Sequence, residues 1–171
     1  MARSLLTIGY EGSSFADFLA TLQEARINTV IDIRDVPISR KAGFSKNALT
    51  QALETAGISY VHLKELGDPK AGREAARSGD FAEFRRIYAA RLRKAETKTE
   101  LRTAIDIAKE ARACLLCYER DPKNCHRSLV AERMCDLADF RVSHLGVREG
   151  LADGTKRPLQ DDGRQSARKV G

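Results

Sequence analysis

Short apolar runs alternate along this chain with segments in which apolar residues recur every three or four positions. The first pattern predicts buried β-strands, and the second predicts amphipathic α-helices. We expect strands over residues 5–8, 29–34, 58–63, 113–119 and 140–145. We expect helices over residues 15–22, 45–56, 81–92, 101–108 and 125–138.

This alternation also predicts the fold class. Strands that alternate with helices form a largely parallel sheet with helices on both faces. We therefore expect a single α/β domain with about five strands in a Rossmann-like three-layer arrangement. The domain is expected to cover residues 1–147, with a basic loop at residues 67–79. Residues 148–171 have few large apolar side chains and predict a loosely ordered polar tail.

The composition excludes some classes of protein and leaves others open. A chain of 171 residues with 42% hydrophobic and 32% charged residues suits one soluble domain. No apolar run approaches the roughly 20 residues of a membrane span, and the N-terminus does not resemble a secretion signal. We therefore expect a cytoplasmic protein without a membrane partner. The net charge of +6 permits an acidic partner but does not require one.

The segment after the apolar run 113–118 carries the strongest indication of chemistry. The run ends in Glu119, a turn follows, and Cys125, His126 and Arg127 then open a helix. Strand ends and the helix N-termini after them form the usual ligand crevice of such sheets. A helix N-terminus suits an anion and lowers the pKa of a thiol. We predict Cys125 as a nucleophile or redox-active thiol, with His126 or Glu119 as its proton acceptor.

Two more strand ends are expected at the same edge of the sheet. Residues 9–12 form a glycine-bracketed turn after the first strand, and the second strand ends in charged residues. Charges in a buried strand are costly unless they are paired or functional. A loop over residues 38–44 follows and could cover a phosphate-bearing small molecule or a nucleic acid. The side chains predicted to bind such an anion are Tyr10, Glu11, Asp32, Arg34, Ser39 and Arg127.

The same residues also allow a purely structural explanation. Asp32 and Arg34 then form an ion pair at a strand end, and Arg127 pairs with Asp32 or Glu119 to hold the sheet edge. A different function is a non-catalytic module that binds nucleic acid through the basic segment 70–94. The sequence contains no known nucleic-acid motif and only 6% aromatic residues for base stacking.

The cysteines leave a third function open. Four cysteines do not make a disulfide framework in a chain of this size. Cys114 and Cys117 have C-x-x-C spacing, but an odd separation on a strand places them on opposite faces. A metal site would instead use Cys117, Cys125 and His126, with zinc or iron as the ion. We predict no cofactor and keep this metal site as an alternative.

Five short motifs together resemble a known family. They are Ile8-Gly-Tyr-Glu-Gly12, Asp32-Ile-Arg34, Gly57-Ile-Ser-Tyr60 leading to Leu66-Gly67, Leu116-Cys-Tyr-Glu119 and Cys125-His-Arg127. This set resembles the domain of unknown function family 488 over most of the chain. The resemblance implies a compact bacterial or archaeal α/β protein and supplies no catalytic role. Where relatives often have two glycines, this chain has Gly67-Asp68.

Overall fold

The protein is a single α/β domain built on one parallel sheet. The computed structural model describes residues 1–154. The strands are β1 (Arg3–Gly9), β2 (Thr29–Asp32), β3 (Ser59–His62), β4 (Ala113–Cys117) and β5 (Phe140–Leu145). All neighbouring strands pair in parallel, in the order β3-β2-β4-β1-β5. This confirms the fold class predicted from the alternating pattern.

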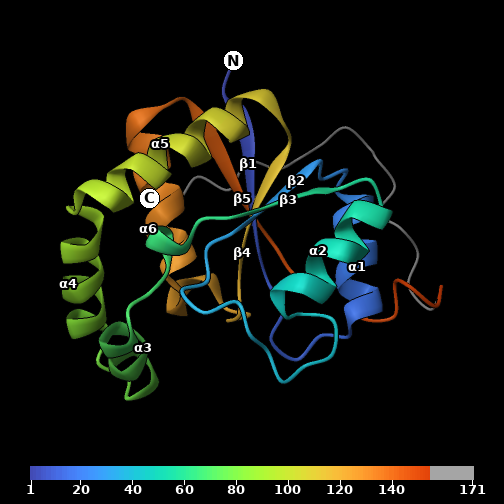
Figure 1. Ribbon diagram of the computed structural model, residues 1–171, viewed down its shortest axis with the longest axis horizontal. Coiled ribbons are helices and arrows are strands. Elements are labelled where there is room, and N and C mark those ends of the chain that lie inside the picture. Colours follow the sequence, from blue (N-terminus) through green and yellow to red (C-terminus); the bar gives the residue numbers. More distant parts are fainter. Residues whose placement is uncertain (155–171) are drawn as a thin grey trace.

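Helices cover both faces of the sheet (Figure 1). The first two are α1 (Phe15–Glu24) and α2 (Lys46–Thr55), which pack on one face. The opposite face carries α5 (Ala95–Glu110) and α6 (His126–Leu137), and α3 (Lys70–Arg77) and α4 (Phe81–Leu92) lie on the same side. Two short 3-10 turns, η1 (Lys64–Leu66) and η2 (Pro122–Asn124), lie in the connections.

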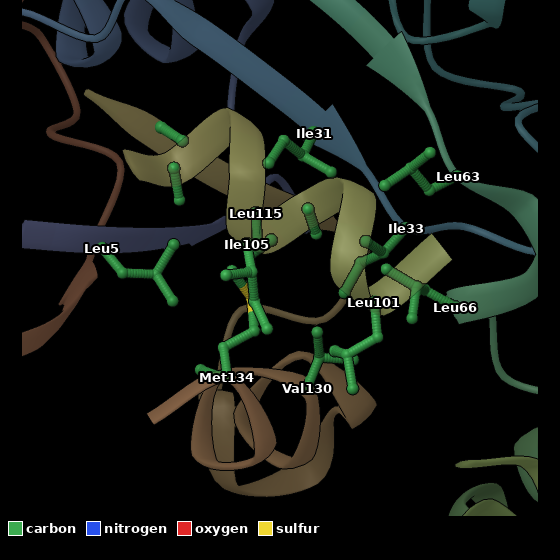
Figure 2. Close-up of a cluster of buried hydrophobic side chains, with 14 of the residues drawn as sticks. Leu5, Ile31, Ile33, Leu63, Leu66, Leu101, Ile105, Leu115, Val130 and Met134 are labelled. Carbon is green, nitrogen blue, oxygen red and sulfur yellow. The ribbon is translucent and has the colours of Figure 1, made fainter. Parts of the chain in front are cut away.

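Alternating side chains on the strands divide the core into two halves. On β4, Ala113 and Leu115 pack against α5 and α6, whereas Cys114 and Leu116 pack against α1 and α2. Cys117 therefore follows the parity of Leu115, and the two cysteines of the C-x-x-C pair point to opposite faces as predicted. Figure 2 shows the first half of the core, with labelled side chains that include Leu5, Ile31, Ile105, Leu115, Val130 and Met134.

The connections place a crevice at the carboxyl edge of the sheet. The chain leaves β1 and β2 towards α1 and α2 on one face, but it leaves β4 towards α6 on the other face. Because β4 lies between β1 and β2, neighbouring loops at this edge separate in opposite directions. Ligands bind in open α/β sheets at such a switch point.

Local signals explain two of the helix starts. Ser14 caps α1, because its hydroxyl accepts the Asp17 N–H at 3.1 Å. At the start of α6 the same position is taken by Cys125, whose sulfur accepts the Arg127 N–H at 3.4 Å. The predicted basic loop at 67–79 is wrong in part, since residues 70–77 form α3 with Gly72 and Ala75 buried.

The beginning of the predicted polar tail contacts α1. The backbone N–H groups of Gly150 and Ala152 each donate to the Asp17 carboxylate at 3.0 Å, and Arg148 pairs with Glu24 at 2.5 Å. The ordered part of the domain therefore extends past residue 147. Residues 155–171 of the predicted tail lie outside the described residues. None of the helices within residues 1–154 is both long and apolar enough to cross a membrane.

Candidate functional site

A cavity of about 710 Å³ opens at the carboxyl edge of the sheet. The loops after β1, β2 and β4 line it, together with residues of α3 and the first residue of α6. Its position is the switch point of the topology, and its volume lies within the usual range for small-molecule sites. The sequence-predicted residues that line it are Tyr10, Arg34, Ser39, Glu119 and His126.

The other predicted residues lie behind or beside the cavity wall. Asp32 and Arg127 are fully buried, and Cys125 is only 2% exposed. Glu11 is exposed at the surface, where its carboxylate accepts the Arg120 N–H at 3.0 Å. The structure thus gathers the predicted residues at one edge of the sheet, but it separates those that face the cavity from those that support it.

Asp32 and Arg34 form a saturated ion pair. Nε and Nη2 of Arg34 donate to the two carboxylate oxygens of Asp32 at 2.9 and 2.7 Å. Asp32 also accepts the Arg34 backbone N–H at 3.1 Å and the Tyr60 hydroxyl at 2.5 Å. Nη1 of Arg34 donates to the Phe44 carbonyl at 2.7 Å and to the Tyr10 hydroxyl at 3.2 Å. This geometry matches the structural explanation, because the pair fastens the 38–44 loop to the end of β2.

Arg127 is buried without a carboxylate partner. Its Nε donates to the Thr7 hydroxyl at 3.0 Å, and Nη2 donates to the Arg120 carbonyl at 3.0 Å. Its Nη1 donates to the Glu119 carbonyl and to the Cys117 sulfur, the latter at 3.0 Å. Among residues 1–154, no Asp or Glu forms an ion pair with this guanidinium. Arg127 therefore holds the loop after β4 through carbonyl groups and one sulfur.

Gly9 allows that loop to come close to β1. A Cβ atom at this position would lie 1.7 Å from the Glu119 carbonyl oxygen and 2.8 Å from the Arg127 guanidinium. Any side chain here would push the loop away and break the contacts of Arg127. Gly9 of the first motif is therefore required by the close approach of the Glu119 carbonyl and the Arg127 guanidinium.

Two cysteines meet beneath the cavity. Cys117 and Cys125 form a disulfide bond, with their Cα atoms 7.5 Å apart. Cys117 comes from the end of β4 and lines the cavity, and Cys125 comes from the N-cap of α6. Among the described residues, Cys114 and Cys135 are free thiols that lie elsewhere.

His126 lies beside this cysteine pair as a neutral imidazole. Its Nε2 is 2.7 Å from the Ile33 carbonyl, so Nε2 carries the proton and donates it. Its Nδ1 then presents a lone pair to the Cys125 sulfur at 3.6 Å. Burial lowers the pKa of His126 to about 4. The imidazole is therefore uncharged at neutral pH.

The donor atoms that could hold a metal differ from the predicted set. Within residues 1–154, Cys117, Glu119 and Cys125 have one potential ligand atom each within 4.8 Å of the others. His126 is not in this group. The guanidinium of Arg127 lies 3.0 Å from the Cys117 sulfur and disfavours a cation there.

Three cations on the cavity wall have no acidic partner. Arg40, Lys41 and Arg77 line the cavity, and no described carboxylate forms an ion pair with any of them. Arg73 also lines the cavity, but it pairs with Asp35 at 3.2 Å. Sequence reasoning placed the first two in a loop over an anion and assigned Arg77 only to a basic segment.

Two carboxyl groups face the cavity in an environment that favours their neutral forms. Asp68 is 6% exposed, and its Oδ1 accepts no hydrogen bond from any described residue. Burial, and then the charge of Glu119, raise the pKa of Asp68 to about 7. Burial also raises the pKa of Glu119. Asp68 was not among the site residues predicted from the sequence.

Apolar and aromatic side chains form the rim of the cavity. Tyr10 stacks on Phe44 with ring centroids 4.2 Å apart and meets the edge of Tyr118 at 5.3 Å. Tyr118 is 48% exposed and Ile38 is 75% exposed, and both line the cavity. An exposed apolar rim beside free cations is suited to a ligand with one apolar and one anionic part.

Comparison with known families decides the relationship suggested by the motifs. The model of the domain of unknown function DUF488 matches residues 14–134, which is well over half of the chain. The protein belongs to the DUF488 family. No curated protein and no solved structure matches the chain.

The DUF488 match includes most of the cavity wall. Residues 14–134 contain the loops after β2 and β4, the whole of α3 and the start of α6. They also contain both cysteines of the pair and Arg127. The family description assigns no activity, so the function has to be inferred from the site itself.

Proposed function

We propose that the protein binds a phosphate-bearing small molecule in this cavity. The observation that carries the proposal is the set of three cations without acidic partners, Arg40, Lys41 and Arg77, beside an exposed apolar rim. The phosphate would contact the cations, and an apolar or aromatic group of the ligand, such as a nucleotide base, would contact the rim.

The charge balance of the cavity supports an anionic ligand. Arg34 and Arg73 are neutralised by Asp32 and Asp35, so they add little to the field in the cavity. The pKa of Asp68 is raised to about 7, so this carboxyl group carries less than a full negative charge at neutral pH. The three unpaired cations therefore dominate, and a concave wall concentrates their field. Guanidinium groups bind phosphate oxygens in a bidentate manner.

The distribution of basic residues favours a small molecule over nucleic acid. The basic segment 70–94 does not present a continuous cationic face, because several of its members are paired with acids. Arg86 pairs with Glu83 at 2.6 Å, and Arg91 lies 3.5 Å from Glu65. Phosphate backbones need many simultaneous contacts for tight binding. Three cations that form no ion pair with a described carboxylate, Arg40, Lys41 and Arg77, instead line one cavity.

A calorimetric titration tests the proposal with a set of defined probes. Pyrophosphate, ADP and adenosine are compared against wild-type protein, Arg77→Ala and an Arg40→Ala/Lys41→Ala double variant. We expect ADP to bind more tightly than adenosine, and each variant to weaken ADP by about tenfold or more, since a charge-assisted hydrogen bond contributes about 1.5–3 kcal/mol.

Arg86→Ala is the matched control. Arg86 is an exposed arginine outside the cavity, and its guanidinium pairs with Glu83. Its removal should leave the affinity for ADP unchanged. The proposal is overturned if neither ADP nor pyrophosphate binds, or if both cavity variants bind ADP as tightly as the wild type does.

A further inference from the structure

The charge of Arg127 has to be balanced inside the protein. A guanidinium cannot lose its proton under ordinary conditions, and a buried unpaired charge costs several kcal/mol. Arg127 is 0% exposed, and its oxygen partners are one hydroxyl and two backbone carbonyls, all of them neutral. Its remaining partner is the Cys117 sulfur at 3.0 Å. When the Cys117–Cys125 disulfide is reduced, Cys117 becomes a thiol that can ionise, so it is the group in contact with Arg127 that can then supply the missing charge.

Cys125 is placed to act as the second thiol. Its sulfur touches that of Cys117 and accepts the Arg127 N–H at the start of α6. Two adjacent thiolates repel each other, so one sulfur keeps its proton when the other is ionised. The His126 Nδ1 lone pair, 3.6 Å from the Cys125 sulfur, faces this thiol and can accept a hydrogen bond from it.

We propose that Cys117 and Cys125 form a redox-active dithiol at the base of the cavity, with Cys117 as the attacking thiolate and a small-molecule disulfide as its substrate. This differs from the sequence prediction, which assigned the nucleophile to Cys125. Cys117 lines the cavity and contacts the buried guanidinium, whereas Cys125 does not line the cavity. Arg127 acts as a positioning residue that holds the sulfur of Cys117 and stabilises its charge.

The exchange proceeds in two balanced steps. The Cys117 thiolate attacks one sulfur of the substrate disulfide, which forms a mixed disulfide and releases the other half as a thiolate. Cys125 then gives its proton to the released thiolate and attacks the Cys117 sulfur. The Cys117–Cys125 disulfide forms, and the second half of the substrate leaves as a thiolate. The protein loses two electrons, and the substrate gains them as it becomes one thiol and one thiolate, which takes its proton from water.

The structure holds the oxidised pair that the second step produces, because Cys117 and Cys125 are disulfide-bonded. Cys125 lies at the end of the loop between β4 and α6.

The charged groups around the dithiol favour a negatively charged Cys117. Besides Arg127 of α6, the neighbouring titratable groups are Glu119 after β4, Asp68 before α3 and His126. Burial raises the pKa values of both carboxyl groups and lowers the pKa of His126. Arg127 is the charged group that contacts the Cys117 sulfur directly.

The preference for an anionic disulfide is the one part of this inference that rests on the proposed function. Arg40, Lys41 and Arg77 line the same cavity as Cys117 and should attract oxidised glutathione, which is anionic, over cystamine, which is cationic. The thiol chemistry itself depends only on the internal contacts of Cys117, Cys125 and Arg127.

Disulfide exchange followed by peptide mass mapping tests the inference. Reduced, full-length protein is mixed with oxidised glutathione or cystamine, and the bonds formed are located in the wild type, Cys125→Ser, Cys117→Ser and Cys135→Ser. We expect a Cys117–Cys125 disulfide in the wild type and in the Cys135→Ser control. In Cys125→Ser the mixed disulfide should accumulate on Cys117, and serine retains the N-cap of α6. Cys117→Ser should form neither product.

The two disulfides separate failure of the inference from failure of the proposed function. A rate about tenfold higher with oxidised glutathione supports both. Equal rates support the dithiol and contradict the cationic site. Absence of the Cys117–Cys125 bond with either reagent overturns the dithiol, whether or not ADP binds. Modification confined to Cys135, or stoichiometric zinc that blocks both thiols of the purified protein, also overturns it.

The role of Arg127 is tested without reagent access by ultraviolet absorbance of the thiolate. The wild type should show one thiolate with a pKa below about 8.5, which Cys117→Ser lacks and Cys135→Ser retains. Arg127→Lys keeps the charge but changes the contact, so it should raise the pKa of the Cys117 thiol. Arg127→Met removes the charge and should raise this pKa further. A purely structural role of Arg127 would leave the pKa unchanged. If Cys117→Ser retains the low-pH thiolate, the assignment of Cys117 is overturned even when both Arg127 variants fail to fold.

Discussion

Arg34 and Arg127 are both buried arginines near strand ends, and sequence reasoning gave both the same role as anion ligands. They differ in what balances their charge. Arg34 donates two hydrogen bonds to the Asp32 carboxylate, and the charges of the two groups offset each other. Arg127 reaches three neutral oxygen acceptors and one cysteine sulfur. The residue type is the same, and the partner decides whether the site is structural or reactive.

The chemistry of the partner explains this difference. A carboxylate is already ionised at neutral pH, so pairing it with an arginine changes no protonation state and yields a rigid link. The Asp32 contacts raise the pKa of Arg34 against the effect of its burial. A thiol is mostly protonated at neutral pH, so an arginine in contact with it converts an inert group into a nucleophile.

The largest effect is expected when the carboxylate half of the first pair is removed. Asp32→Asn keeps the shape of the side chain but leaves Arg34 as a buried charge without a counter-ion. Breaking one partner of a buried pair costs about 3–5 kcal/mol. We expect the free energy of unfolding in urea to fall by this amount, with little change in the m-value.

Asp35→Asn provides the matched control. Asp35 pairs with Arg73 and Arg91, but these ion pairs are partly exposed, and such pairs contribute about 0–1 kcal/mol. If both substitutions lower the free energy of unfolding by the same amount, burial does not make the Asp32–Arg34 pair more stabilising than an exposed pair. The structural role assigned to Arg34 would then be wrong.

The second pair is tested by comparing two cysteines of one strand. Cys114 and Cys117 are both 0% exposed and lie on β4, but only Cys117 contacts a guanidinium. Replacing either by alanine removes the same atoms, whereas Cys117→Ala also leaves Arg127 without its anionic partner. We expect Cys117→Ala to cost about 1.5–3 kcal/mol more than Cys114→Ala, which is the usual contribution of a hydrogen bond to a charged group.

Urea unfolding with a reductant present measures this difference, because it keeps all thiols reduced. Burial raises the pKa of Cys114, so its thiol remains neutral and serves as the reference for an uncharged sulfur. Equal losses of stability in the two variants would mean that Cys117 is also neutral, and would remove the contrast between Arg34 and Arg127.

The sequence predicts the frame of the molecule well because its signals are local. The period of the apolar residues gives all five strands, and Phe140–Leu145 matches the predicted fifth strand at both ends. The Ser14 cap and the helix that follows Cys125 were also readable from spacing. Convergence of three strand ends at one edge follows from parallel topology alone.

The partners of the charged residues could not be predicted, because they come from distant parts of the chain. Arg127 contacts Thr7 across 120 positions, and Tyr60 reaches Asp32 across 28. Spacing places Asp32 and Arg34 on one strand face, but it does not reveal that the Phe44 carbonyl and Tyr10 use the remaining donors. Similarly, the choice between Cys117 and Cys125 depends on which sulfur lines the cavity.

Asp68 extends the contrast to a buried acid without a base. Its Oδ1 accepts no hydrogen bond from any described residue, so the buried carboxyl group favours its protonated form. An arginine, in contrast, stays charged at any ordinary pH. The folded state holds the proton up to about pH 7, whereas the unfolded chain releases it near pH 4. Between these values the unfolded state binds fewer protons, so stability falls as the pH rises, by at most about 1.4 kcal/mol per pH unit.

Asp68→Asn removes this titration while keeping the size of the side chain. The variant should gain stability relative to the wild type as the pH rises from about 5 to 8, and its own stability should depend less on pH over that window. Urea unfolding at several pH values measures the effect. A wild type whose stability does not decrease relative to the variant would show that Asp68 is ionised in the folded state. A base would then have to balance Asp68, as Arg34 balances Asp32.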